Sequence, residues 1–177
     1  MEQQFASPFR TDTTPEDSPM PQQASRAYVK PTILLVEDNM ADARKIVRAA
    51  ETIKWEHEIV VVNDGAAALR YVRGQAPYAG ATRPSMILLD LNLPGLSGFE
   101  VLAAIKGDIA TRRIPVVVIS SSGEASDVSR AYEAHANAYL RKPVGMDALN
   151  QLARALQQFW FRMVTLPTRG EAHARRL

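Results

Sequence analysis

Three runs of four consecutive apolar residues set the strongest constraint on how this chain folds. They are Ile33-Leu34-Leu35-Val36, Met86-Ile87-Leu88-Leu89 and Val116-Val117-Val118-Ile119. Because apolar and polar residues do not alternate within them, each run is typical of a short strand buried on both faces. Two further strands, at residues 59–62 and 138–140, complete a set of five that alternates with helical patterns. The sequence therefore predicts an α/β fold in which helices cover both faces of a parallel sheet.

The composition is that of one domain with tails. With 177 residues, the chain is long enough to bury a hydrophobic core without the support of disulfides or a structural metal. It has no cysteine, which excludes disulfides and thiolate metal sites and is compatible with a reducing compartment. The net charge of +2 gives no argument for binding nucleic acid or an anionic membrane. Since no apolar run approaches the roughly 20 residues that span a bilayer, we expect a soluble cytoplasmic protein.

We expect three segments along the chain. Residues 1–30 are polar, with scattered prolines and no sustained periodicity, which is typical of disorder. Residues 31–167 contain the five strands and five helices, and the last helix runs from Met146 to Phe161 or beyond. Residues 168–177 form a flexible polar tail. The expected strand order is 2-1-3-4-5.

Polar groups follow most of the predicted strands at the point where each strand ends. Glu37 and Asp38 follow the first strand, Asp90 the third, Ser120 the fourth and Lys142 the fifth. The carboxyl ends of parallel strands meet at one edge of the sheet, where ligands bind in this class of fold. For Asp90 taken alone, an acid that merely caps a turn is an equal alternative. The shared pattern favours a functional site.

Three carboxyl groups gathered at one edge need positive charge among them. Close together they raise one another's pKa by repulsion unless a cation is present. Mg²⁺ meets this need, because it prefers oxygen ligands and binds one or two carboxylates together with a phosphate oxygen. Asp90, the central acid, is then the candidate nucleophile for a phosphoryl group. Lys142 and Mg²⁺ would neutralise the phosphoryl oxygens, and the Ser120 hydroxyl would donate a hydrogen bond to them.

These residues together resemble the receiver domain of two-component response regulators. The matching motifs include Asp90-Leu91-Asn92-Leu93-Pro94-Gly95 and Lys142-Pro143, and the resemblance extends over residues 32–155. It implies a flavodoxin-like, doubly wound fold of five strand–helix units. It also implies that a sensor histidine kinase is the partner and that its phosphohistidine phosphorylates Asp90.

The same resemblance assigns roles to individual residues around the acidic cluster. The implied Mg²⁺ ligands are Asp38, Asp90, the backbone carbonyl of Asn92 and, through water, Glu37. The peptide bond before Pro143 is expected to be cis, a form that costs little before proline.

Two further residues resemble the switch pair of this family. Ser120 would follow the phosphoryl group inward, and Tyr139 would change rotamer in response and remodel the face formed by the fourth helix, fifth strand and fifth helix. For Tyr139 the alternative is a half-buried strand aromatic without a switching role. Ser121 stands where many receivers have Ala or Gly, and it would alter access to the phosphoryl group.

Three features narrow the resemblance: Asp38-Asn39 with Asp42, the long loop before the Asp90 strand, and Phe159-Trp160 followed by Val164, Leu166 and Pro167. They resemble the single-domain regulators that accompany bacterial and cyanobacterial phytochromes, which suggests a bacteriophytochrome as the kinase. Consecutive helical residues are about 100° apart, so three adjacent aromatic side chains cannot all face one core. We therefore predict a homodimer through this region. The alternative is an aromatic plug that closes the bottom of the domain. The predicted dimer contacts are Phe159, Trp160, Phe161, Val164 and Leu166.

The expected function is that of a phosphorylation-switched signalling protein without an output domain. Such a protein catalyses only its own phosphoryl transfer and dephosphorylation, so we do not expect an enzyme. A phosphate sink or relay intermediate is an alternative that the sequence does not separate from this one. An aspartyl-phosphate phosphatase is less favoured, because such a hydrolase usually has an acid two residues after the nucleophile, where this chain has Asn92.

Overall fold

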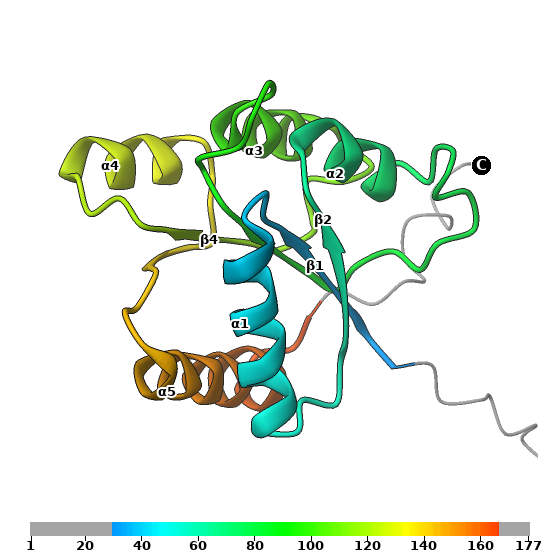
Figure 1. Ribbon diagram of the computed structural model, residues 1–177. Helices are drawn as coiled ribbons and strands as arrows, with labels where there is room; N and C mark the ends of the chain where they lie inside the picture. Colours follow the sequence, from blue (N-terminus) through cyan, green and yellow to red (C-terminus); the bar gives the residue numbers. More distant parts are fainter. Residues whose placement is uncertain (1–29, 167–177) are drawn as a thin grey trace, which may run out of the picture.

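The computed structural model describes residues 30–166, and its five strands pair in parallel in the order β2-β1-β3-β4-β5 (Figure 1). The strands are β1 (Thr32–Val36), β2 (Glu58–Val62), β3 (Met86–Leu89), β4 (Val116–Ser120) and β5 (Ala138–Arg141). The predicted fold class and strand order are confirmed. The disorder expected before residue 30 and the tail expected from residue 168 lie outside the described residues.

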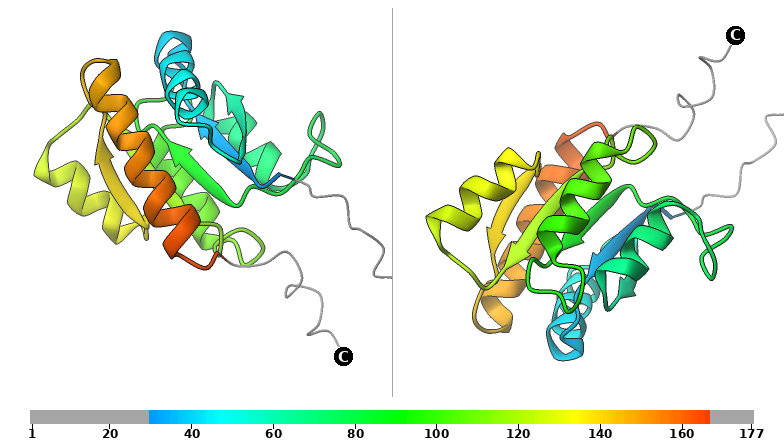
Figure 2. Two further views of the ribbon diagram at one scale, coloured as in Figure 1. Left: turned by 90° about the horizontal axis from the view of Figure 1, so that it is seen from below. Right: turned by 90° about the horizontal axis from the view of Figure 1, so that it is seen from above.

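Helices cover both faces of this sheet (Figure 2). On one face lie α1 (Met40–Thr52) and α5 (Met146–Leu156), which pack side by side. On the other face lie α2 (Gly65–Val72), α3 (Gly98–Gly107) and α4 (Ala125–Glu133). The sheet therefore separates two apolar layers, as right-handed crossovers between parallel strands require.

The central strands contribute alternate residues to the two layers, which explains their unbroken apolar runs. In β3, Ile87 and Leu89 face the core beneath α2 and α3, while Met86 and Leu88 face the core beneath α1 and α5. All four side chains are completely buried. A polar residue at any of these positions would lose its hydration without gaining a partner, and this is why the pattern is continuous rather than alternating.

The last helix differs from the prediction. The α-helix α5 ends at Leu156, and residues Gln157–Met163 form a π-helix with i→i+5 hydrogen bonds. This geometry winds more residues into each turn, so two consecutive aromatic side chains, Trp160 and Phe161, both contact the body of the domain. Phe159 is left 52% exposed.

Local signals place most helix starts. Asn39 and Asp64 cap α1 and α2 through their side chains, and Ser97 forms a capping box with Glu100 at the start of α3. The helix predicted to begin at Ser126 or Asp127 begins at Ala125 instead, and no side chain caps it. The helix α4 is thus the most weakly terminated of the α-helices on its face of the sheet.

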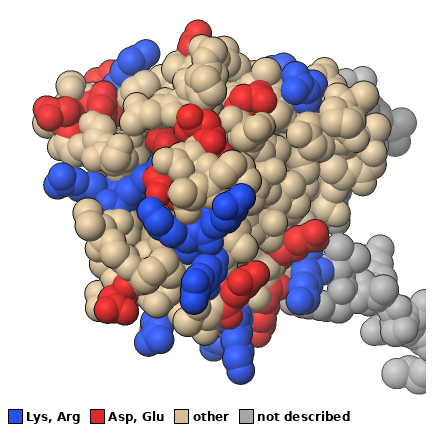
Figure 3. Space-filling view, in the orientation of Figure 1, with Lys and Arg blue, Asp and Glu red and all other residues tan. Residues whose placement is uncertain are grey.

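The surface of the domain carries charges of both signs. On the face seen in Figure 3, acidic and basic side chains lie intermixed over the helices. Within residues 30–166, none of the helices has the length and apolar character needed to cross a membrane.

Candidate functional site

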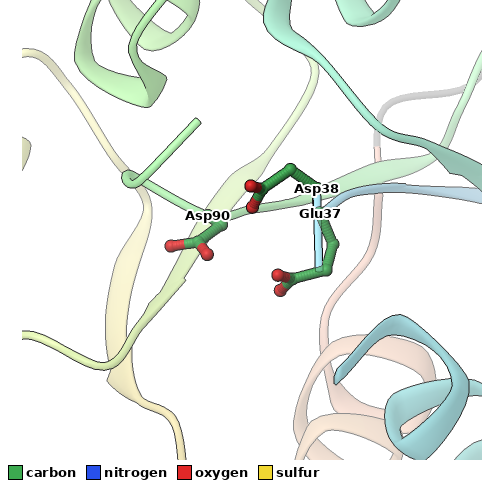
Figure 4. A group of neighbouring side chains, drawn as sticks. All are labelled: Glu37, Asp38 and Asp90. Atoms are coloured by element: carbon green, nitrogen blue, oxygen red, sulfur yellow. The ribbon is translucent and has the colours of Figure 1, made fainter. Parts of the chain in front are cut away.

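Parallel pairing brings the ends of β1 and β3 together. The backbone amide of Asp90 donates to the Val36 carbonyl at 3.0 Å, and the amide of Glu37 donates to the Val62 carbonyl at 3.0 Å. The residues that follow β1 and β3 therefore emerge at the same edge of the sheet. Figure 4 shows the carboxyl groups of Glu37, Asp38 and Asp90 gathered there.

The three carboxyl groups form a compact cluster. One oxygen from each of Glu37, Asp38 and Asp90 lies within 4.8 Å of the others. Glu37 and Asp90 are buried, whereas Asp38 is exposed. Three oxygen donors at this spacing, open to solvent on one side, fit a hard divalent cation that retains part of its water shell.

Lys142 supplies the positive charge next to this cluster. Its Nζ lies 2.7 Å from Asp90 Oδ2 and 2.6 Å from Glu37 Oε2, and the side chain is 15% exposed. The backbone amide of Lys142 donates to the Ser120 carbonyl at 2.7 Å, which fixes the residue directly after β5. One lysine against three carboxylates leaves the site negative, so its charge also favours a divalent cation.

The pKa shifts follow from burial and from this ion pairing. Burial raises the pKa of Glu37, the contact with Lys142 lowers it, and the nearby Asp90 carboxylate raises it; the net shift is upward. Repulsion between carboxylates is therefore a smaller cause than the sequence reasoning assumed. Burial alone would lower the pKa of Lys142, but its contacts with Asp90 and Glu37 outweigh that effect and raise it.

The loop after Asp90 packs tightly against the start of α3. The amide of Asn92 donates to Asp90 Oδ1 at 3.2 Å, which orients the carboxyl group. The amide of Gly98 donates to the Leu91 carbonyl at 3.0 Å, and a Cβ at Gly98 would collide with the Asp90 backbone. Glycine is required at this position because only a residue without a side chain allows that approach. The turn thereby holds Asp90 at the edge of the sheet where the strands end.

The two proposed switch residues lie on neighbouring strands. Ser120 ends β4 and is completely buried, and its Oγ accepts a hydrogen bond from the Ser122 amide at 3.2 Å. Tyr139 on β5 is half-buried, and its hydroxyl donates to the Ser122 carbonyl at 3.0 Å. Both hydroxyls hydrogen-bond to the backbone of Ser122, which therefore joins the two residues.

Two of the predictions made for individual residues are wrong. Within residues 30–166 the cis peptide bond is Ala76–Pro77, and the bond before Pro143 is not cis. Since both isomers before proline are close in free energy, the sequence alone does not decide between them. Trp160 is 9% exposed and belongs to the core formed with α1 and α5, so it is not available as a dimer contact.

Phe161 also packs within its own chain. Its ring stacks on His57 at 3.7 Å between centroids and meets Trp55 edge-on at 5.4 Å. This arrangement corresponds to the aromatic plug that the sequence analysis held as the alternative. The extra residue per turn of the π-helix makes it possible, because it turns two adjacent aromatic rings toward the body.

The sequence analysis noted Asp42 as a feature of the subfamily but did not assign it to the site. Asp42, in the first turn of α1, lies 3.8 Å from Lys142 Nζ and also pairs with Lys45 at 2.9 Å. It is the acidic residue in the first turn of α1, the helix that follows the Glu37-Asp38 pair directly. An acid in the first turn of a helix that begins at the site edge is the signal that could have identified it.

Similarity to known proteins agrees with this geometry. The family described as the response regulator receiver domain matches residues 33–154. Response regulator Rcp1 of Synechocystis sp. is 43% identical over 135 residues, which are 76% of this chain and 92% of Rcp1. The crystal structure of the phosphorylated cyanobacterial phytochrome response regulator RcpA has a TM-score of 0.75 at 44% identity. That similarity covers 79% of this chain and 100% of RcpA.

A related crystal structure bears on the acidic cluster. The Mn²⁺-bound form of Rcp1 has a TM-score of 0.73 at 42% identity and covers 78% of this chain and 99% of Rcp1. Receiver domains bind a divalent metal at their acidic site, and the cluster of Glu37, Asp38 and Asp90 is the acidic site of this chain. The expectation of a divalent cation is confirmed.

Proposed function

The chain belongs to the response regulator receiver family, and from this premise we propose that it is switched by transfer of a phosphoryl group from a histidine kinase to Asp90. The single observation that carries this assignment is the position of the Asp90 carboxylate. It is buried at the sheet edge, 2.7 Å from Lys142 Nζ and inside the acidic cluster. Glu37 shares the burial, the Lys142 contact and the cluster, but it follows β1, whereas Asp90 follows β3, the middle strand of the five.

In the transfer, an oxygen of the Asp90 carboxylate attacks the phosphorus atom. The new P–O bond forms as the P–N bond to the donor histidine breaks, and the imidazole leaves with its electron pair and takes up a proton. Lys142 neutralises the phosphoryl oxygens as a point charge at the place where its ammonium now contacts Asp90. The Asn92 amide holds the second carboxylate oxygen in position.

A divalent ion at this site would supply further neutralisation of the phosphoryl charge. We assign its ligands to Asp38, Asp90 and the backbone carbonyl of Asn92, with Glu37 bound through water. Ser120 would donate a hydrogen bond to the phosphoryl group, and Tyr139 would respond from β5. The buried position of Ser120 and the shared contact of both hydroxyls with Ser122 support this switch.

A hollow of about 290 Å³ supports a protein as the phosphodonor. It lies beside Lys142, and its wall includes Ile46 of α1 and the turn at Val144, a residue that is 96% exposed. A hollow that combines apolar side chains with the charged Asp42, Lys45 and Lys142, next to the reactive carboxylate, suits a partner protein that presents a histidine. Because RcpA is a phytochrome response regulator, we propose a bacteriophytochrome as this kinase. A cytoplasmic location and a signalling rather than metabolic role follow from that partner.

The test of this function is phosphoryl uptake. Acetyl phosphate with Mg²⁺ should add one phosphoryl group to the wild type, measured by intact-protein mass spectrometry, and Asp90→Asn should abolish the addition. Asp64→Asn is the matched control, because Asp64 follows β2 as a helix cap and Asn caps equally well. Full labelling of Asp90→Asn would exclude Asp90 as the acceptor.

We also propose that the chain forms a homodimer through the outer side of the π-helix. Phe159 and Met163 are 52% and 72% exposed, and they are followed by the partly buried Val164 and Leu166, which pack against the core. Apolar side chains exposed on one side of an element favour contact with a second copy. Phe159→Ala should weaken the dimer about tenfold or more in sedimentation equilibrium, since burying an aromatic ring is worth roughly 1.5–3 kcal/mol.

A matched control for the dimer is available on another part of the surface. Ile109 is 77% exposed in the connection between α3 and β4. Ile109→Ala removes a similar exposed apolar side chain and should leave the association unchanged. A wild type that sediments as a monomer at tens of micromolar, phosphorylated or not, would exclude the dimer.

A phosphate sink is the second function that this site could serve. It would use the same phosphoryl transfer but bind no target after phosphorylation. Pull-down of a binding partner with the phosphorylated form, compared with Asp90→Asn, distinguishes the two.

A further inference from the structure

The connection between β4 and α4 is organised around Ser122. Its amide donates to Ser120 Oγ at 3.2 Å, and its carbonyl accepts a hydrogen bond from the Tyr139 hydroxyl at 3.0 Å. Its own hydroxyl donates to Asp127 Oδ2 in the first turn of α4 and accepts from the Glu124 amide at 3.3 Å. One residue is therefore bonded to both proposed switch residues and to the helix beside them.

The helix α4 has few other attachments. Its one buried residue is Ala131, whereas α3 buries Val101, Leu102 and Ile105. The residue that precedes α4, Glu124, provides no side-chain cap. The first turn of α4 thus depends on the hydrogen bond from Ser122, which is charge-assisted because its acceptor is a carboxylate.

The far half of α4 is held differently. The guanidinium of Arg130 lies over the Phe99 ring at 4.0 Å from its centroid, a cation–π contact with α3. This contact and Ala131 fasten the second turn but leave the first turn free to move if the bond to Ser122 breaks. The helix has one end fastened by packing and one end fastened by a single polar contact.

We propose that Ser122 is a positioning residue that couples the phosphoryl state of Asp90 to α4, and that its hydrogen bond to Asp127 latches the first turn of the helix. This inference rests on the proposed function, specifically on the movement of Ser120 toward a phosphoryl group. We call the Ser122–Asp127 hydrogen bond the latch.

The coupling follows from the short connection between these atoms. When the Ser120 hydroxyl moves toward Asp90, it either leaves the Ser122 amide without an acceptor or draws Ser122 along with it. Because the amide, carbonyl and hydroxyl belong to one residue, a displacement of Ser122 that follows Ser120 alters its contacts with both Tyr139 and Asp127. Movement of the Ser120 hydroxyl toward Asp90 thereby breaks the latch and releases the first turn of α4.

The test is amide hydrogen exchange over residues 122–133 in the full chain with Mg²⁺, with and without excess acetyl phosphate. In the wild type, phosphorylation should speed exchange in the first turn of α4 about tenfold, because a hydrogen bond to a charged acceptor contributes about that factor. Unphosphorylated Ser122→Ala and Asp127→Ala should already exchange at this faster rate. Phosphorylation should then add less than about twofold in both variants.

Two control variants separate the latch from general loosening of the helix. Ser122→Thr retains a hydroxyl and should behave like the wild type. Ser126→Ala removes an exposed hydroxyl from the same turn and should leave exchange unchanged. In every variant, mass spectrometry should show that Asp90 still takes up one phosphoryl group.

Three results would overturn the latch. They are wild-type exchange in unphosphorylated Ser122→Ala, an undiminished response to phosphorylation in that variant, and loss of the latch in Ser122→Thr. A wild type that takes up no phosphoryl group would instead overturn the proposed function, and mass spectrometry detects that failure independently of exchange.

Discussion

The two ends of the sheet hold their side chains by different forces. At the edge where the strands end, the acidic side chains of Glu37 and Asp90 can be buried because Lys142 Nζ lies within 2.7 Å of both. At the opposite end, Trp160 and Phe161 close the domain by ring contacts and burial. We call these regions the rim and the base.

The two regions respond differently when one of their side chains is removed. At the rim, loss of a partner leaves a charge that can take up a proton or attract a cation, so the damage depends on pH and on metal. At the base, loss of a ring leaves a cavity that neither pH nor metal fills. The rim can therefore change state during signalling, whereas the base keeps the fold constant.

The largest expected effect on stability is at the base. Trp160→Ala should lower the free energy of unfolding by about 3–5 kcal/mol, the cost of truncating a buried aromatic side chain. Urea denaturation measures it. The neighbouring Phe159, which is 52% exposed, is the matched control, and Phe159→Ala should cost less than about 1 kcal/mol in monomeric protein. Equal losses for the two variants would show that the base is not packed as described.

At the rim, Lys142→Met should have a smaller and conditional effect. It leaves Glu37 and Asp90 without their cation, and we expect a loss of about 1–3 kcal/mol at pH 8 without metal. The loss should shrink at pH 5, where Glu37, whose pKa is already raised, can take up a proton. Added Mg²⁺ should restore stability to this variant but not to Trp160→Ala.

The pKa shift of Lys142 sets the direction of a related pH effect. Because the pKa of Lys142 is raised in the folded state, its contribution to stability is fully present below its ordinary value of 10.5 and is lost as the pH rises through the folded value. Lys45→Met is the matched control, since Lys45 is 58% exposed and pairs only with Asp42 among the described residues. It should change stability by less than about 0.5 kcal/mol. If the loss of stability in Lys142→Met depended on neither pH nor Mg²⁺, the charge-based account of the rim would be wrong.

The smallest effect is a pH dependence at the base. Burial lowers the pKa of His57, although the nearby Glu56 opposes the shift, and the buried Nδ1 has no hydrogen-bond partner among the described residues. The unfolded chain therefore binds the proton more tightly, so wild-type stability should fall as the pH drops below 6.5.

Urea midpoints at pH 7.5 and 5.5 measure this slope. His57→Gln should reduce it, whereas His135→Gln, at an exposed position, should not. A slope that is unchanged in His57→Gln would show that His57 and Phe161 do not form a proton-sensitive contact.

Much of the rim could be predicted from local pattern. The apolar runs identify the strands, and the polar residue after each run identifies Glu37, Asp38, Asp90, Ser120 and Lys142 as neighbours, because parallel strands end at the same edge. The prediction did not extend to Asp42, whose contact with Lys142 depends on how α1 leaves the rim. It also did not reveal that Ser122 connects the two switch residues.

At the base, the sequence determined only that three adjacent aromatic residues could not all share one face of an α-helix. The tertiary structure decided the outcome by forming a π-helix there and by supplying partners from distant parts of the chain. Trp55 Nε1, for example, donates to the Ala153 carbonyl across 98 residues of sequence at 3.2 Å. Strand identity and strand-end residues follow from neighbouring residues and from the burial of a central sheet, so the sequence by itself determined them. The tertiary structure alone decided the isomer before Pro143, the inward orientation of the Phe161 ring and the attachment of α4. Each depends on small free-energy differences between contacts that exist only after the chain has folded.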